Sequence, residues 1–419
     1  MEAHVGVDAC LISIEREEDL QPAALVAANA LLASRVGHHD AAEAWFNLAI
    51  ERARDIESKA ALVYRSSLAM LRRGRTDCIP RLEEYAAVDS SLAAGLNATL
   101  ATAYVIADRP AEAMRRAHVA RDILAGQDRS IQRTRTLYQI AYVALRTGEF
   151  EEAKTFARET VESARRHNDY DIAARGFSLL YELAHHIDCD PRSALRYIEM
   201  VEICATESGD EAVRTWANMA GFYLEIEAGN VPAAHARESA LKAEDIVQSV
   251  DLTSATLVPA QALRCSWRRD FAQAHRLVAE SGETQPTPEF RAFRFSESAL
   301  YAAASGAVEE ARAAIESSEW TLTHASCNSR ARIMAQAFCT LAAALAIGIE
   351  SAEARVARLE RMREEAPPSM NAVITAVRAV YDSWCGKPNH AELLDSFAAL
   401  REHYFGGISM LLEALPVPS

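Results

Sequence analysis

Residues 137–160 read LYQIAYVALRTGEFEEAKTFARET, and this stretch decides the fold of the chain. An apolar helical pattern runs up to a glycine at Gly148, and a second helical pattern with acidic residues at its start follows. Small residues at Ala153 and Ala157 allow the second helix to pack closely against the first. Such a pair of helices forms an antiparallel hairpin that cannot bury its apolar face alone. The stretch therefore predicts one unit of a stacked helical repeat.

The turn and the second helix recur at a regular interval along the chain. Successive second-helix alanines are separated by 41, 40, 40, 37, 41 and 39 residues; they are Ala153, Ala194, Ala234, Ala274, Ala311, Ala352 and Ala391. Earlier copies follow Gly37, Gly74 and Asp108. This period, with two helices per unit, predicts an all-α, right-handed α-solenoid of about ten helical hairpins. We place the superhelix at residues 21–400, between an N-terminal segment at 1–20 and a capping helix with a tail at 401–419.

The composition supports a helical chain and bounds its partners. The 419 residues exceed the size at which one globular core keeps growing, and Gly (16) and Pro (13) are sparse. The net charge of −15 argues against direct nucleic-acid binding, which draws its free energy from phosphate neutralisation by Lys and Arg. Basic clusters such as Arg72, Arg73 and Arg75 are interpreted as solvated helix ends, with a binding patch as the alternative.

The sequence predicts a cytoplasmic protein without a membrane span. Its first 20 residues lack the basic region and the long apolar core of a signal peptide. The longest apolar run, residues 341–349, is shorter than the about 20 residues that cross a bilayer. The eight cysteines are scattered without a C-x-x-C pair, which is typical of reduced thiols.

The turns and second helices resemble the tetratricopeptide repeat family. The resemblance rests on residues 148–153 (GEFEEA), on residues 37–49 and on residues 306–311, and it extends over roughly residues 20–400. The period near 40 residues is longer than that family's 34 and is similar to the sensor superhelices of bacterial MalT-type regulators and peptide-pheromone receptors. The resemblance implies that the first helices line a concave, partner-binding face. We find neither the helix-turn-helix domain nor the ATPase domain of those regulators in this sequence.

Aromatic residues on two of the first helices form the candidate binding site. They share the spacing i, i+3 and i+7, which places them on one helix face; they are Arg135, Tyr138 and Tyr142, and, two units later, Trp216, Met219 and Tyr223. An aromatic strip with a guanidinium suits an extended peptide or an amphipathic helix. Residues near the ends of the same helices would supply polar anchors; they are Arg146, His186 and Glu227. The alternative interpretation is that the aromatic side chains form inter-repeat core.

No catalytic, metal or cofactor site is predicted. The sequence contains no G-x-x-x-x-G-K-[ST] phosphate loop, no G-x-S-x-G elbow and no H-E-x-x-H motif. Adjacent histidines on a helix point about 100° apart. His185 and His186 are therefore interpreted as a polar helix end and not as a metal site.

The predicted function is a non-enzymatic scaffold or sensor that binds a protein segment, a peptide or a small-molecule effector in its concave groove. The alternative is a transcription-regulatory protein that acts through a DNA-binding partner or RNA polymerase, and a basic patch at Arg72, Arg73 and Arg75 would favour it. After the last hairpin, residues 405–407 (FGG) break the chain and residues 408–415 form an apolar helix. This helix is predicted to cap the last repeat, or alternatively to form a homodimer contact.

Overall fold

The computed structural model describes residues 26, 28–30, 33, 38–71, 73–88, 90–125, 131–241, 257–282, 288–325, 327–387 and 390–418. These residues are helical or lie in turns and short connections, and they contain no strand. The chain divides into two compact units, residues 1–172 and residues 173–419. Among the described helices, none is both long and apolar enough to cross a membrane.

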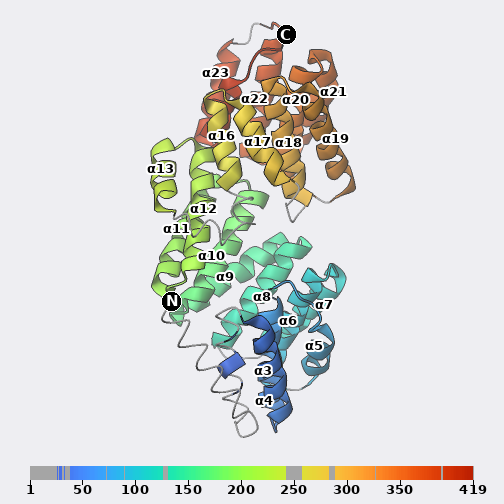
Figure 1. The fold of residues 1–419 in the computed structure, drawn as a ribbon, viewed down its shortest axis with the longest axis vertical. Helices are drawn as coiled ribbons and strands as arrows, with labels where there is room; N and C mark the ends of the chain where they lie inside the picture. Colours follow the sequence, from blue (N-terminus) through green and yellow to red (C-terminus); the bar gives the residue numbers. More distant parts are fainter. Residues whose placement is uncertain are drawn as a thin grey trace. The chain divides into compact units, whose positions relative to one another are not determined.

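Unit 1 is built from antiparallel helix pairs (Figure 1). Its described helices are α3 (His39–Arg52), α4 (Ile56–Leu71), α5 (Ile79–Ala86), α6 (Ala93–Ile106), α7 (Pro110–Ala125), α8 (Ile131–Thr147) and α9 (Phe150–Arg166). The pairs α4/α5, α6/α7 and α8/α9 are hairpins, and α6 also packs against α4 and α8. First helices of successive hairpins therefore lie side by side, as a stacked repeat requires.

Unit 2 continues the pattern, beginning within α10 (Tyr170–Glu182), which spans the boundary, and η2, a π-helical turn (Leu183–Ile187). Its further helices are α11 (Pro191–Ser208), α12 (Glu211–Ala228), α13 (Val231–Ala240), α16 (Val258–Trp267), α17 (Phe271–Gly282), α18 (Pro288–Ser305), α19 (Val308–His324), α20 (Ser329–Ala346), α21 (Ile349–Arg361), η4, a 3-10 turn (Met362–Glu364), α22 (Pro368–Trp384), α23 (His390–Glu402) and α24 (Gly406–Ala414). The all-α solenoid of helical hairpins predicted from the period is confirmed.

The hairpin turns share one backbone device. From α4/α5 onward, each described turn between first and second helix contains a residue with positive φ; these residues are Gly74, Asp108, Gly148, Cys189, Gly229, Arg269, Gly306, Gly348 and Gly386. At Gly148 φ is 89°, and the next amide, of Glu149, donates to the carbonyl of Ala144 at 2.9 Å. This bond satisfies a carbonyl that the end of α8 would otherwise leave unpaired. The predicted glycine turn of residues 137–160 is therefore confirmed.

The second-helix alanines pack as predicted in all but one hairpin. The alanine is the fourth residue of its helix and is at most 3% exposed at Ala42, Ala113, Ala153, Ala194, Ala234, Ala274, Ala311 and Ala352. The prediction is wrong for Ala391, which is exposed in the first turn of α23. The fourth residue of α23 is Leu393, which packs against the core and lies 41 residues after Ala352. The period is thus kept in the last hairpin, but a larger side chain takes the packing position.

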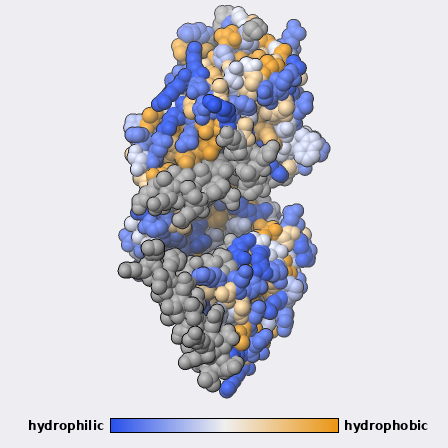
Figure 2. All heavy atoms as spheres, viewed as in Figure 1, coloured by the Kyte–Doolittle hydropathy of each residue, from blue (hydrophilic) through white to orange (hydrophobic). Residues whose placement is uncertain are grey.

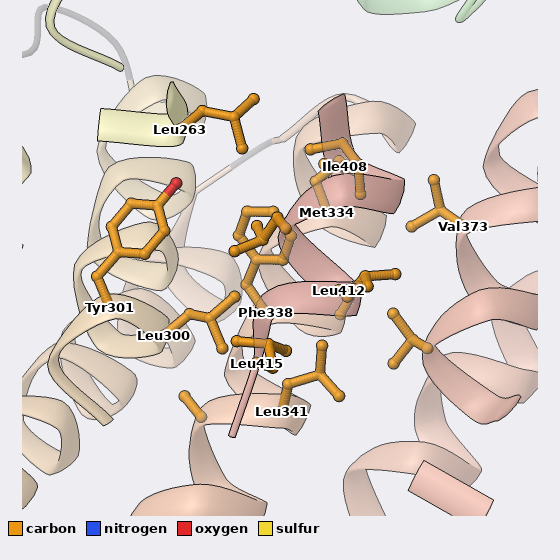
Figure 3. Close-up of a cluster of buried hydrophobic side chains, with 14 of the residues drawn as sticks. Leu263, Leu300, Tyr301, Met334, Phe338, Leu341, Val373, Ile408, Leu412 and Leu415 are labelled. Carbon is orange, nitrogen blue, oxygen red and sulfur yellow. The ribbon is translucent and has the colours of Figure 1, made fainter. Parts of the chain in front are cut away.

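The last helix, α24, lies inside unit 2. It packs against α12, α16 and α22 as well as α23. Figure 3 shows Ile408, Leu412 and Leu415 among Met334 and Phe338 of α20. The predicted capping of the last repeat is therefore only part of its role. The homodimer contact was inferred from an exposed apolar stripe, and that premise is wrong because the apolar side chains of α24 are buried.

The surface is mainly polar on the face drawn in Figure 2, where hydrophilic side chains surround separate apolar patches. Most large apolar side chains are in the cores of the two units. A few described ones are more than 40% exposed, and Trp320 on α19, at 64%, is an example.

Candidate functional site

The α8 strip, which we define as Arg135, Tyr138, Tyr142 and Arg146, lies on the surface of unit 1. Tyr138 and Tyr142 are half-buried, and both arginines are exposed. The spacing of three, four and four residues places all four side chains on one helix face. The guanidinium of Arg146 lies 5.2 Å from the centre of the Tyr142 ring, within the range of a cation–π contact. The strip therefore has two aromatic rings in its middle and a cation at each end.

The other faces of α8 pack against neighbouring helices, so the α8 strip is the face that remains partly exposed. Leu137, Ile140, Ala141 and Ala144 are buried. Gln139 donates to the Thr99 hydroxyl of α6 at 2.9 Å, and the hydroxyls of Thr134 and Ser163 of α9 lie 2.6 Å apart. These contacts fix the rotation of α8 about its axis.

The first cation of the strip is weakly compensated. The guanidinium of Arg135 lies 3.9 Å from the Asp169 carboxylate, and about half of the Arg135 side chain is exposed. A pair of this length on a surface contributes little free energy. Arg135 can therefore turn toward a carboxylate of a ligand without a large loss elsewhere.

The unit 2 part of the predicted groove is different, and two of its residues are not available to a ligand. Met219 is fully buried and Tyr223 is 9% exposed, so their prediction as groove residues is wrong in this structure. The physical reason is that α12 lies inside unit 2 and packs against α11, α16 and α24. Trp216 is half-buried and meets the ring of Tyr181 edge-on at 5.7 Å. His186 is half-buried beside the same tyrosine.

A buried charge cluster in unit 2 was not predicted. Glu227 of α12 accepts hydrogen bonds from His185 Nε2 at 3.2 Å, from the Tyr223 hydroxyl at 3.4 Å and from Arg330 of α20. The side chains of Glu227 and His185 are 2% exposed, and that of Arg330 is 6% exposed. Glu227 was predicted to be a polar anchor of the groove and His185 to belong to a polar helix end; both predictions are wrong because the two side chains are buried.

The protonation states in this cluster follow from burial and from the ion pair. Burial lowers the pKa of His185, and the neighbouring Arg330 charge lowers it further, so His185 is neutral. Burial alone would raise the pKa of Glu227, but Arg330 and His185 hold it below its usual value. Burial likewise raises the pKa of Tyr223. The cluster therefore holds one carboxylate and one guanidinium that neutralise each other.

A second buried pair lies near this cluster on α18. Arg294 donates to Glu297, with side chains 1% and 5% exposed. Burial raises the pKa of Glu297, and Arg294 acts against this effect. A sequence signal existed for such pairs, since acidic and basic residues occur within apolar first helices. The partners of Glu227, however, lie on other hairpins, and the spacing of residues along one helix does not reveal them.

The basic cluster after α4, for which a binding patch was the alternative interpretation, is largely neutralised. Arg75 binds Glu43 at 2.5 Å and also binds Asp77, and this guanidinium holds the pKa of Asp77 below its usual value. Arg73 is exposed, and Arg72 lies outside the described residues. A pocket of about 300 Å³ opens beside these side chains, and it is lined by Ala42, Glu43, Phe46, Asn47, Ser66, Ser67, Ala69, Met70, Arg73, Asp77, Cys78, Pro80 and Arg81. Its charged residues are balanced in sign.

Comparison of the sequence with protein-family models and with curated proteins finds no match. Among solved structures, the apo form of the quorum sensor NprR from B. thuringiensis has a TM-score of 0.53 at 13% sequence identity, over 85% of this chain and 99% of that chain. Ton1535 from Thermococcus onnurineus NA1 has a TM-score of 0.32 at 10% identity, over 92% of this chain and 99% of that chain, which is too low to compare folds. The chain therefore has the tetratricopeptide-like helical-repeat fold that its sequence predicts, and shares it with NprR.

Proposed function

We propose that this protein is a non-enzymatic binding protein of the sensor or scaffold kind, and that it holds an extended peptide against the α8 strip of unit 1. The observation that carries the proposal is the pair of half-exposed tyrosines, Tyr138 and Tyr142, between two exposed arginines. Aromatic rings supply large contact area at small entropic cost, and arginines direct carboxylates by paired hydrogen bonds.

The chemistry of the strip defines the peptide. Apolar or aromatic peptide side chains would stack on the two tyrosine rings, while acidic side chains or a terminal carboxylate would pair with Arg135 or Arg146. The half-burial of the rings supports this, because packing fixes their inner parts while their outer parts are exposed to a ligand. A rigid, pre-formed surface binds more tightly than one that must order.

The comparison with NprR supports a sensor in particular, because that protein is named a quorum sensor and the two share a fold. Unit 2 is a poorer candidate for the same role, since Met219 and Tyr223 are buried and α24 lies on α12. We therefore assign peptide binding to unit 1. A cytoplasmic location is part of this proposal.

A selection experiment tests the proposal. A randomised peptide library displayed on phage is selected on the full chain, and the enriched peptides are measured against the Tyr138→Ala/Tyr142→Ala variant by fluorescence polarisation. We expect enriched peptides that combine apolar and acidic residues, with affinity for the variant lower by at least about a hundredfold, as for truncated hot-spot residues. Arg135→Glu should weaken the acidic peptides alone.

The control is Trp320→Ala, which removes an exposed aromatic residue from α19 of unit 2. It should leave affinity unchanged, and circular dichroism should show equal helicity for all variants. The proposal is wrong if no peptide is enriched, or if the double variant binds the enriched peptides as tightly as the wild type while folding normally.

A further inference from the structure

We call the face of unit 2 that its first helices form the inner face. Contacts between early and late hairpins close this face. In an open stack each hairpin touches only its neighbours. In unit 2, however, Arg330 of α20 donates to Glu227 of α12, and Ser369 of α22 donates to the Cys189 carbonyl at 2.5 Å. Trp267 of α16 donates to the Gly407 carbonyl of α24 at 2.9 Å. These bonds join residues more than 100 positions apart, and Arg330 and Trp267 also contact Phe405 and Gly407 at the start of α24.

The start of α24 approaches the end of α12 so closely that only glycine fits. A Cβ atom on Gly407 would lie 2.1 Å from the Ile226 carbonyl oxygen, and one on Gly406 would lie 2.4 Å from that of Ala228. Both obstacles are backbone atoms, which cannot move aside as a flexible side chain can. The two glycines therefore allow the start of α24 to pack directly against the end of α12, and any larger residue would prevent this.

Two opposing contributions determine how stably α24 is bound: burial of its apolar side chains and burial of polar groups beneath it. Its apolar residues Ile408, Leu411 and Leu412 are at most 4% exposed, which favours the seated position. Just before α24, the Phe405 ring lies 5.1 Å from the Arg330 guanidinium, whose Nη1 is buried without a hydrogen-bond partner among the described residues. His185 Nδ1, in the same cluster, is buried without a hydrogen-bond partner among the described residues. Water would satisfy these groups if α24 left.

The backbone of the segment between α23 and α24 also favours release of α24. Tyr404 joins α23 to α24 with φ at 64°, in the left-handed region where a residue other than glycine is strained. The strain is relieved when the link is free to change conformation. Apolar burial thus holds α24 in place against backbone strain and unsatisfied buried polar groups.

We propose that α24 is a releasable plug, which closes the inner face of unit 2 and on release exposes a groove that binds an amphipathic helix with the pattern of residues 405–415. The occupant of the groove is this chain's own segment. A plugged groove and an open one would give unit 2 two states, which a sensor needs and which the peptide site of unit 1 does not itself supply.

Hydrogen exchange on the full chain, followed by mass spectrometry, is the first test. Peptides from α24 should exchange by local opening at least about tenfold faster than peptides from α20, whose Met334 and Phe338 share its apolar cluster. Trp267→Phe, which removes the bond to Gly407, should speed exchange in α24 and leave α20 unchanged. Trp320→Phe on the exposed side of α19 is the matched control. Equal protection of α24 and α20 would overturn the proposal.

A binding test uses a fluorescent synthetic peptide of residues 405–415. In the Gly407→Val full chain the native α24 cannot seat, so the wild-type peptide should bind at least about tenfold more tightly than it binds the wild-type protein. Gly386→Val is the control: valine is strained at its φ of 74°, but a Cβ there meets no atom of the described residues within 4 Å, so this variant destabilises a turn without obstructing α24. A peptide that itself carries Gly407→Val should not bind. Cooperative loss of helicity in the Gly407→Val protein, or absence of peptide binding to it, would show that α24 is an integral part of the core.

Discussion

At the scale of single residues, the Glu227 cluster shows how charge is accommodated inside an apolar repeat. Three donors, on His185, Tyr223 and Arg330, converge on one carboxylate. A buried ion pair of this kind adds little net stability over apolar residues of the same shape, but removing one member leaves a charge uncompensated. The cluster is therefore better understood as a device that specifies which hairpins meet.

Protonation of His185 should make stability depend on pH. The folded pKa of His185 is lowered from 6.5, so the unfolded chain binds the proton more readily, and stability present above pH 6.5 is lost as the pH falls below it. We expect a loss of up to about 1 kcal/mol per pH unit in urea titrations. The groups around His185 are Glu227, Tyr223, Tyr181, His186 and Arg330.

His185→Gln should flatten this dependence between pH 6.5 and 5, whereas His324→Gln, at an exposed position on α19, should not. Other carboxylates titrate in both proteins, so the difference between wild type and His185→Gln isolates the effect of His185. A pH dependence that survives His185→Gln unchanged would contradict the neutral, buried state of this histidine.

A double-mutant comparison tests the charge balance. Glu227→Gln leaves Arg330 buried without its counter-charge and should lower the free energy of unfolding by about 3–5 kcal/mol. Glu227→Leu combined with Arg330→Met removes both charges and should be more stable than Glu227→Gln alone. Guanidinium titrations monitored by circular dichroism measure both. If the double variant is the less stable of the two, the pair contributes net stability and the specificity argument fails.

At the scale of the element, the hairpin turn carries the repeat. Two turn glycines have similar φ but different surroundings: among the described residues, a Cβ on Gly148 meets no atom within 4 Å, while one on Gly229 lies 2.9 Å from the Gly406 backbone. Gly148→Ala should cost about 1 kcal/mol, from the left-handed backbone alone. Gly229→Ala should cost about 1–3 kcal/mol more, since it also displaces the start of α24. Thermal unfolding of the two variants checks this order, and equal losses would show that α24 does not press on the turn.

The same scale shows what the sequence could and could not predict about the site. Tyr138 and Tyr142 lie on the partly exposed face of α8, as their spacing predicts for one helix face, because the other faces are apolar or bonded to α6 and α9. Met219 and Tyr223 have the same spacing on α12 and are buried. Tyr223 shares the Glu227 carboxylate with Arg330, which is more than 100 positions away, and helical periodicity contains no information about such a partner.

At the scale of the whole molecule, the repeat period was enough to predict the fold, because each hairpin is specified by residues close together in the sequence. Positive-φ turns and second-helix alanines recur at the predicted positions with Ala391 as the exception, and Leu393 replaces it without a change of period. The return of α24 onto α12 was not predictable in this way. It is a contact between distant hairpins, and nothing in the repeat unit encodes it.

The net charge gives the last prediction, which tests whether the chain contacts DNA itself. With a net charge of −15 and Arg75 bound to Glu43 and Asp77, the described surface offers little to a phosphate backbone. We expect no retardation of duplex DNA in gel electrophoresis, even at low salt. Glu43→Gln combined with Asp77→Asn releases Arg75 and is the comparison most favourable to binding. A salt-sensitive complex with the wild-type chain, lost in Arg73→Ala/Arg75→Ala, would instead support a regulator that contacts DNA itself.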